Sequence, residues 1–118
     1  MKIDSTEFGS ITVNGATYAH DILIRLSGEV LKRKKKFSRK YYNTDHIISR
    51  EEAEFIYEKG CNTLILGAGQ YDNMELSLEA SEFFRHHDCR VILRPTPDAV
   101  TAYNKAEGRA VGLFHVTC

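Results

Sequence analysis

The stretch LILGAGQYD, residues 64–72, decides how this chain is expected to fold. It begins with an apolar run that is typical of a buried strand, and it then breaks into two glycines. A dinucleotide-binding loop needs a third glycine and a helix that begins inside the motif. Asp72 holds that third position, where a carboxylate repels phosphate, and no Walker A Gly-Lys-Ser/Thr follows. We therefore predict a sharp exit from a strand, with Gly67 and Gly69 supplying unusual backbone conformations.

The segments around this strand alternate between helix and strand signals. Ser49 followed by Glu52 is a capping-box pattern and predicts a helix over about 49–59. Apolar spacing predicts that the next helix begins at about Ser77. Thr96-Pro97-Asp98 predicts the start of a third helix with Thr96 as its N-cap. Strands are predicted at residues 63–66, 90–93 and 110–116.

The amino-terminal part carries hairpin signals instead. Asn14-Gly15 favours a type I′ turn, because that turn requires positive φ at both central residues. It should join a strand near 11–13 to a longer one near 17–26. Ser27-Gly28 then turns the chain into a third antiparallel strand at about 30–34.

These elements predict a single α/β domain spanning residues 1–118. A β-meander portion covers about 1–45, and a portion of alternating helices and strands covers about 46–118. If the later strands run parallel, their carboxyl ends bring three segments together, and ligands bind outside such ends. The expected contacts of a small anionic ligand at this rim are Gly67, Gly69, Gln70 and Thr96.

His115 and Cys118 are the weak catalytic candidates at the same rim. Strand positions three apart face opposite sides, so a shared role requires the tail to bend. The alternative is a packed terminal strand with an inert thiol. The three cysteines are widely spaced without a Cys-x-x-Cys pair, and we expect reduced thiols, no metal site and no cofactor.

Charge is concentrated in one segment although the whole chain has a formal net charge of zero. Seven of the 16 Lys and Arg residues lie between positions 32 and 40, where no Asp or Glu occurs. Three interpretations compete: a docking face for an acidic protein partner, a site for single-stranded nucleic acid, and a solvated strand edge. The balanced net charge argues against nucleic acid. The docking residues are expected to be Lys34, Lys35, Lys36, Arg39 and Lys40, with a second copy of the chain as another partner.

No apolar run reaches the ~20 residues that span a bilayer, and the first ten residues lack the apolar core of a signal peptide. We therefore expect a cytoplasmic protein.

Five motifs together resemble a known family. They are FGSITVNGATYAHDI (8–22), NTDH (43–46), LILGAG (64–69), PTPDAVTAYN (95–104) and HVTC (115–118). In this order and spacing they are similar to the small single-domain family of the adipogenesis-associated domain protein and, more distantly, mitochondrial complex I assembly factor three. Two positions depart from its pattern. Many members have a third glycine at Asp72, and Gly-Thr-Ser-His where residues 43–46 read Asn-Thr-Asp-His.

The resemblance implies a three-layer α/β fold with a central mixed sheet and an added antiparallel β-meander layer. It also implies a non-catalytic protein-interaction or assembly role, because members of the family are described as an assembly factor and a differentiation-associated protein without an established enzyme activity. The alternative is a small-molecule binding protein or enzyme that uses the rim at the carboxyl ends of the strands.

Overall fold

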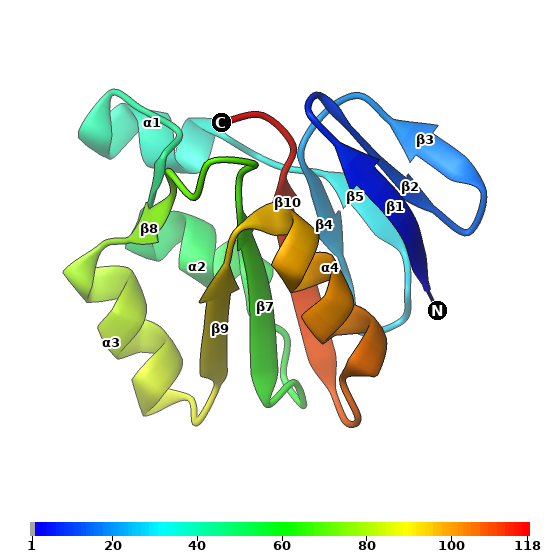
Figure 1. Ribbon diagram of the computed structural model, residues 1–118. Coiled ribbons are helices and arrows are strands. Elements are labelled where there is room, and N and C mark those ends of the chain that lie inside the picture. The colour runs from blue at the N-terminus through cyan, green and yellow to red at the C-terminus, as the bar shows by residue number, and fades with distance from the viewer. Residues whose placement is uncertain (1) are drawn as a thin grey trace.

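The computed structural model describes residues 2–118, which fold around a five-stranded mixed sheet of order β5-β4-β10-β7-β9 (Figure 1). Its strands are β4 (Ile22–Ile24), β5 (Val30–Lys32), β7 (Thr63–Ala68), β9 (Arg90–Arg94) and β10 (Ala110–His115). The central strands β7, β9 and β10 are parallel, which is the condition on which the expected rim depends. β4 and β5 extend the sheet in antiparallel pairs. The carboxyl ends of the three parallel strands therefore share one edge, which we call the carboxyl edge.

Two hydrophobic clusters hold the layers together. On one face of the sheet, Leu64 and Leu66 pack with Ile56 and Phe84 of the helices α2 (Arg50–Ile56) and α3 (Leu78–His86). The other face is covered by α4 (Thr96–Lys105) and a three-stranded antiparallel sheet, as Figure 1 shows. That sheet consists of β1 (Ile3–Glu7), β2 (Ser10–Val13) and β3 (Ala16–Tyr18). The predicted three-layer α/β architecture with an added β-meander layer is confirmed.

The hairpin at Asn14-Gly15 is confirmed, with φ values of 50° and 82° and Val13 paired with Ala16. The single strand predicted at about 17–26 is wrong. It divides into β3 and β4, which belong to different sheets. Ile22, Leu23 and Ile24 are all buried, because β4 packs against a layer on each face. A strand buried on both faces has no alternating pattern that sequence reading could follow.

The helix α1 (Lys36–Tyr42) was not expected. Its first turn has no acidic residue and no side-chain cap, so the usual local signals for a helix start are missing. Tertiary packing supports it instead. Ser38 is completely buried, and the Phe37 ring lies 5.5 Å from the Phe55 ring of α2.

Two other helix boundaries also differ from the prediction. α2 ends at Ile56 rather than near residue 59, because Tyr57 is extended. α4 begins at Thr96 itself, with Pro95 in the N-cap position. The strand β1 and a short parallel pair, β6 (Ile47–Ile48) with β8 (Glu75–Leu76), were also missed. Within residues 2–118, no helix has the length and apolar character needed to cross a bilayer.

Candidate functional site

The carboxyl edge brings together the three segments that the sequence places there. The buried Thr96 hydroxyl donates to the His115 carbonyl (2.6 Å) and accepts from the Gly69 N–H (2.9 Å). The Thr96 N–H donates to the Gly69 carbonyl (3.0 Å). A single threonine therefore ties together the exits of β7 and β10 and the start of α4.

The glycines of this edge are needed for close packing. A Cβ added to Gly67 would lie 2.9 Å from Thr96 Oγ1, and one added to Gly69 would lie 2.5 Å from the carbonyl carbon of Cys118. Gly69 also has a φ of +98°, which L side chains rarely adopt. The prediction of an unusual backbone conformation is confirmed at Gly69 and wrong at Gly67, which lies within β7 and has no positive φ. The tail of the chain lies directly against Gly69.

The remaining rim residue, Gln70, is also joined to its neighbours. Its N–H donates to the Thr117 carbonyl (2.7 Å), and its side chain donates to Thr6 Oγ1 (3.3 Å). The Gly9 N–H donates to the Val116 carbonyl (2.8 Å) and fixes the turn between β1 and β2 at the same edge. A ligand role for Gly67, Gly69, Gln70 and Thr96 stays a prediction. Their polar groups already hold the edge together.

Next to this rim lies a cluster of ionisable side chains, of which sequence reading identified only His115 as a site candidate. We call Asp21, Arg33, Glu52 and His115 the buried charge network. Their relative exposures are 1%, 4%, 1% and 1%. Arg33 Nε donates to Glu52 Oε2 (2.7 Å), and Arg33 Nη2 donates to Glu52 Oε1 (3.0 Å). This is a two-pronged pairing that suits the planar guanidinium.

Arg33 also joins segments that are distant in sequence. Its Nη1 donates to Asp21 Oδ2 (3.1 Å), and its Nη2 donates to the Asp45 carbonyl (2.8 Å). Burial alone would lower the pKa of Arg33, but Glu52 and Asp21 raise it above its ordinary value. The guanidinium is therefore a permanent buried charge whose partners come from the β3–β4 connection, the α1–β6 loop and α2.

Two buried serines complete the side of the network that faces α1. Ser38 Oγ donates to Glu52 Oε1 and accepts from the Ser49 N–H (3.0 Å). Ser49 Oγ accepts from the Glu52 N–H (3.1 Å), so the predicted N-cap of α2 is confirmed. In the predicted capping box the Glu52 carboxylate would bond the Ser49 N–H. Here it pairs with Arg33 and Ser38, and the Ser38 hydroxyl takes its place.

His115 extends the network toward the surface. Its Nδ1 lies 2.7 Å from Asp21 Oδ2, and its Nε2 lies 3.2 Å from Thr117 Oγ1. An ionised carboxylate only accepts hydrogen bonds, so His115 Nδ1 donates to Asp21. Nε2 is hydrogen-bonded to the Thr117 hydroxyl. His115 is therefore part of a chain of hydrogen bonds from Asp21 to half-buried Thr117. A catalytic role for His115 and Cys118 stays a prediction.

The ionisation of Asp21 follows from these contacts. Burial alone would raise its pKa, but hydrogen bonding and charge from His115, the Val116 N–H and the charge of Lys35 lower that pKa to about 2. Every buried side-chain nitrogen and oxygen within residues 2–118 has a hydrogen-bond partner. The network is therefore fully satisfied, as a buried ionic cluster must be if the domain is to stay stable.

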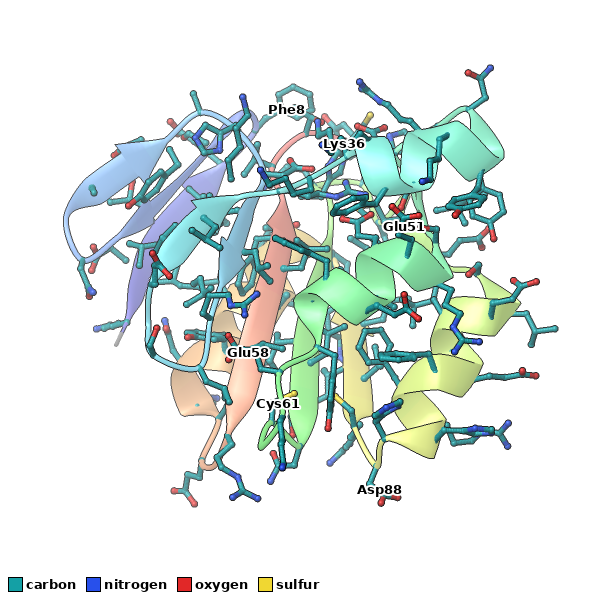
Figure 2. All side chains as sticks on the ribbon, turned by 180° about the vertical axis from the view of Figure 1, so that it is seen from behind. Phe8, Lys36, Glu51, Glu58, Cys61 and Asp88 are labelled. Atoms are coloured by element: carbon teal, nitrogen blue, oxygen red, sulfur yellow. The ribbon has the colours of Figure 1, made fainter. Side chains whose placement is uncertain are left out.

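The residues expected to dock a partner lie on the connection between β5 and α1 and on α1 itself. We call Lys34, Lys35, Lys36, Arg39 and Lys40 the basic face. All are exposed except half-buried Lys35, whose Nζ lies 3.1 Å from Asp45 Oδ2 and 3.8 Å from Asp21 Oδ2. Lys40 pairs with Glu51 (2.7 Å). Figure 2 shows Lys36 at the same end of the molecule as Phe8.

A depression of about 390 Å³ adjoins the basic face at the carboxyl edge. We call it the basic depression, and it is lined by Ala19, His20, Asp21, Lys32, Arg33, Lys35, Arg39, Val116 and Thr117. Four cationic side chains and one carboxylate take part in its wall, and Thr117 links it to His115. No group of three or more metal-ligating side chains occurs among the described residues.

The missed residues did leave a signal in the sequence. Asp21 directly precedes the apolar run Ile22–Ile24, and Arg33 directly follows Val30–Lys32, so each charge stands at the end of an observed strand. Strands that pair antiparallel bring such ends together. The partner Glu52 could not be found in this way, because its packing against β5 depends on the placement of α2.

Known proteins share the sequence pattern and the fold of this chain. A model of the family described as "Protein of unknown function (DUF498/DUF598)" matches residues 3–115. The conserved hypothetical protein PH1505 from Pyrococcus horikoshii OT3 is 32% identical, with a TM-score of 0.93 over 100% of both chains. The protein MT938 is also 32% identical, with a TM-score of 0.83 over 99% of this chain and 98% of its own.

A more distant structure shows likeness of fold alone. A Bordetella pertussis protein described as a Mth938-like domain is 15% identical, with a TM-score of 0.64 over 98% of this chain and 85% of its own. The family match and the two structures at 32% identity agree over nearly the whole chain. This chain therefore belongs to the DUF498/DUF598 family of proteins of unknown function.

Proposed function

We propose that this domain is a non-catalytic interaction module that docks an acidic protein partner through its basic face, in the assembly of a larger complex. The observation that carries the proposal is the combination of exposed cations and exposed aromatic rings at one end of the molecule. Phe8 and Tyr71 are 59% and 69% exposed, and their rings lie 6.0 Å apart. Aromatic side chains at the centre of an interface with charges at its rim are typical of docking surfaces.

The basic face is also held firmly in place. Arg33 and Ser38 anchor the segment on both sides of Lys36 through buried bonds to Glu52. Charges on a rigid element lose less entropy when a partner binds. Complementary charge raises the association rate more than it raises the affinity, so a partner of opposite charge would be captured fastest at low salt.

The family resemblance to the adipogenesis-associated domain protein and to mitochondrial complex I assembly factor three supports an assembly role of this kind. Within this proposal, the resemblance to these proteins suggests an assembly role. The surface chemistry of this chain suggests the type of partner, which is a protein with acidic groups around an apolar contact.

The test compares charge reversal on the basic face with charge reversal elsewhere. Tagged protein captures its partner from its own cells at low salt, and the partner is identified by mass spectrometry. The triple variant Lys34→Glu, Lys36→Glu, Lys40→Glu should lose the partner. The matched control Lys59→Glu, Arg85→Glu, Lys105→Glu should retain it, because these exposed positions lie on other elements. Equal capture by both triple variants would overturn the proposal.

The aromatic contribution is tested separately. Phe8→Ala with Tyr71→Ala should speed dissociation of the identified partner in surface plasmon resonance while leaving the salt dependence of association unchanged. Leu78→Ala is the control, because Leu78 is 71% exposed on a different element. If the double variant and Leu78→Ala change the dissociation rate equally, the aromatic pair is not part of the docking surface.

The second candidate is a small-molecule binding protein or enzyme at the carboxyl edge, with Gly67, Gly69, Gln70 and Thr96 as ligand contacts. The convergence of these residues with His115 and Cys118 favours it. Under this proposal Thr96→Ala abolishes ligand binding, and Cys118→Ala abolishes any turnover. The basic-face variants leave both unchanged.

A further inference from the structure

The basic depression shares Lys35 and Arg39 with the basic face but extends beyond it. It is not the exposed outer side of α1, since Lys34, Lys36 and Lys40 do not line it. It is also not the Gly67–Thr96 rim, whose amides and hydroxyl bond to one another. We propose that the basic depression is a binding site for a small organic anion of the phosphate-monoester class.

Charge is the first reason. Lys32, Lys35 and Arg39 reach the depression from the end of β5, from the residue before α1 and from α1 itself. Asp21 is the single carboxylate among the lining residues, and it accepts bonds from Arg33, His115 and the Val116 N–H. Its charge is therefore already balanced from within the protein. Lys35 and Arg39 share one further carboxylate, Asp45, so the cations Lys32, Lys35 and Arg39 outnumber the carboxylate that pairs with them.

The state of Lys35 is the second reason. Its side chain is 34% exposed and lies between Asp21 and Asp45, at 3.8 Å and 3.1 Å. These carboxylates hold its ammonium group at the inner wall of the depression. Arg39 is 60% exposed and lies 3.5 Å from Asp45. It can turn toward a ligand at little cost, because this long contact contributes little.

Thr117 supplies polarity of a different kind. Its hydroxyl oxygen lies 3.2 Å from His115 Nε2. A hydroxyl has one donor hydrogen and two acceptor lone pairs, so Thr117 keeps hydrogen-bonding capacity for a ligand besides this contact. A phosphate monoester suits this arrangement, since its anionic oxygens take the cations while a P–OH or sugar-like hydroxyl donates to the threonine.

Size is the third reason. A volume of about 390 Å³ exceeds what inorganic phosphate needs and falls within the ~300–1,000 Å³ that small-ligand sites occupy. Ala19, His20 and Val116 line the part that is not cationic. This part can contact the small organic group of the ester.

The test is an NMR titration of amide resonances with glycerol 3-phosphate and with inorganic phosphate, at constant ionic strength set by sodium chloride. We expect saturable shifts at Ala19, Lys32, Lys35, Arg39 and Thr117, with the ester binding more tightly than phosphate. No saturation up to about 10 mM, which corresponds to less than about 3 kcal/mol of binding free energy, would overturn the proposal. If the ester binds no more tightly than inorganic phosphate, the depression binds an adventitious ion only, and the proposal is overturned.

Two matched double variants separate a built site from diffuse charge. Lys32→Gln with Arg39→Gln should weaken binding about tenfold or more, since it removes two cations from the wall. Lys34→Gln with Lys36→Gln removes the same charge outside the depression and should change the affinity less than about twofold. Equal weakening by the two variants would show that no specific site exists.

The threonine has its own control. Thr117→Val should weaken ester binding, and Thr117→Ser should restore it, because serine keeps the hydroxyl oxygen. If Thr117→Val binds as tightly as the unaltered chain, the hydroxyl takes no part and the assigned ligand class is wrong.

A last experiment distinguishes ligand binding in the basic depression from partner docking on the basic face. A glutamate-rich peptide without phosphate should shift Lys34, Lys36 and Lys40, and it should leave the ester bound in the depression. Displacement of the ester by this peptide would show that the depression belongs to the docking surface. The ester titration stands whether or not a protein partner exists, so the two proposals can fail independently.

Discussion

The buried charge network and the basic face begin from adjacent residues and end in opposite environments. Arg33 is 4% exposed and bonded on all sides, whereas Lys34 and Lys36 are exposed to solvent. In the extended chain, successive side chains point to opposite sides, so Arg33 turns inward where Lys32 and Lys34 turn outward. A run of like charges is therefore not one feature. Its members divide between holding the fold together and meeting a partner.

The largest effect is expected when the buried guanidinium is removed. Arg33→Met should lower the free energy of unfolding by about 3–5 kcal/mol, because it leaves Glu52 and Asp21 as unpaired buried charges. Arg50→Met is the matched control. Arg50 is exposed, pairs across one helical turn with Glu54 and lies 5.8 Å from the centroid of the Phe83 ring, so the expected change is below about 1 kcal/mol. Urea denaturation measures both, and equal effects would contradict a special role for burial.

Acid should act on the same network. The pKa of Asp21 is about 2 in the folded chain and 3.8 in its ordinary environment, so the stabilisation is complete above pH 3.8 and is lost as pH falls through about 2. The size of this loss is about 2 kcal/mol. Urea midpoints between pH 5 and pH 2 measure it. Asp21→Asn should flatten this part of the curve, and an unchanged slope would show that Asp21 does not carry the effect.

Removing one hydroxyl of the network should have a smaller effect. Ser38→Ala deprives Glu52 of a donor and the Ser49 N–H of an acceptor, and should cost about 1.5 kcal/mol. Ser81→Ala is the control, since Ser81 is an exposed serine on α3. Thermal or urea unfolding checks the difference. A cost below that of the control would mean that another group replaces the hydroxyl.

The smallest effect is expected at the basic face. Lys34→Gln with Lys36→Gln should change the free energy of unfolding by less than about 0.5 kcal/mol, because both side chains are solvated. The same variant should slow capture of an acidic partner. Stability loss comparable to that of Arg33→Met would place these lysines in the fold rather than on a docking surface.

Much of the edge where the candidate sites lie could be predicted from the sequence. The apolar run before Gly67 predicts a buried strand, and the order of helices and strands is compatible with parallel pairing and a shared carboxyl edge. The Asn14-Gly15 turn and the Ser49 and Ser77 caps depend on residues within a few positions of one another. Local geometry decides such features, so they can be read from a single chain.

The tertiary structure alone decided the rest. The helix α1 lacks local signals and is held by Ser38 and Phe37 against α2, which lies after it in the chain. The hydrogen-bond partner of His115 Nδ1 is Asp21, 94 positions away. Burial makes a charged group costly unless partners surround it, and those partners come from whichever segments the sheet brings together. The sequence determined the strands and turns of this protein, and the packing of distant segments determined which charged side chains are buried and paired.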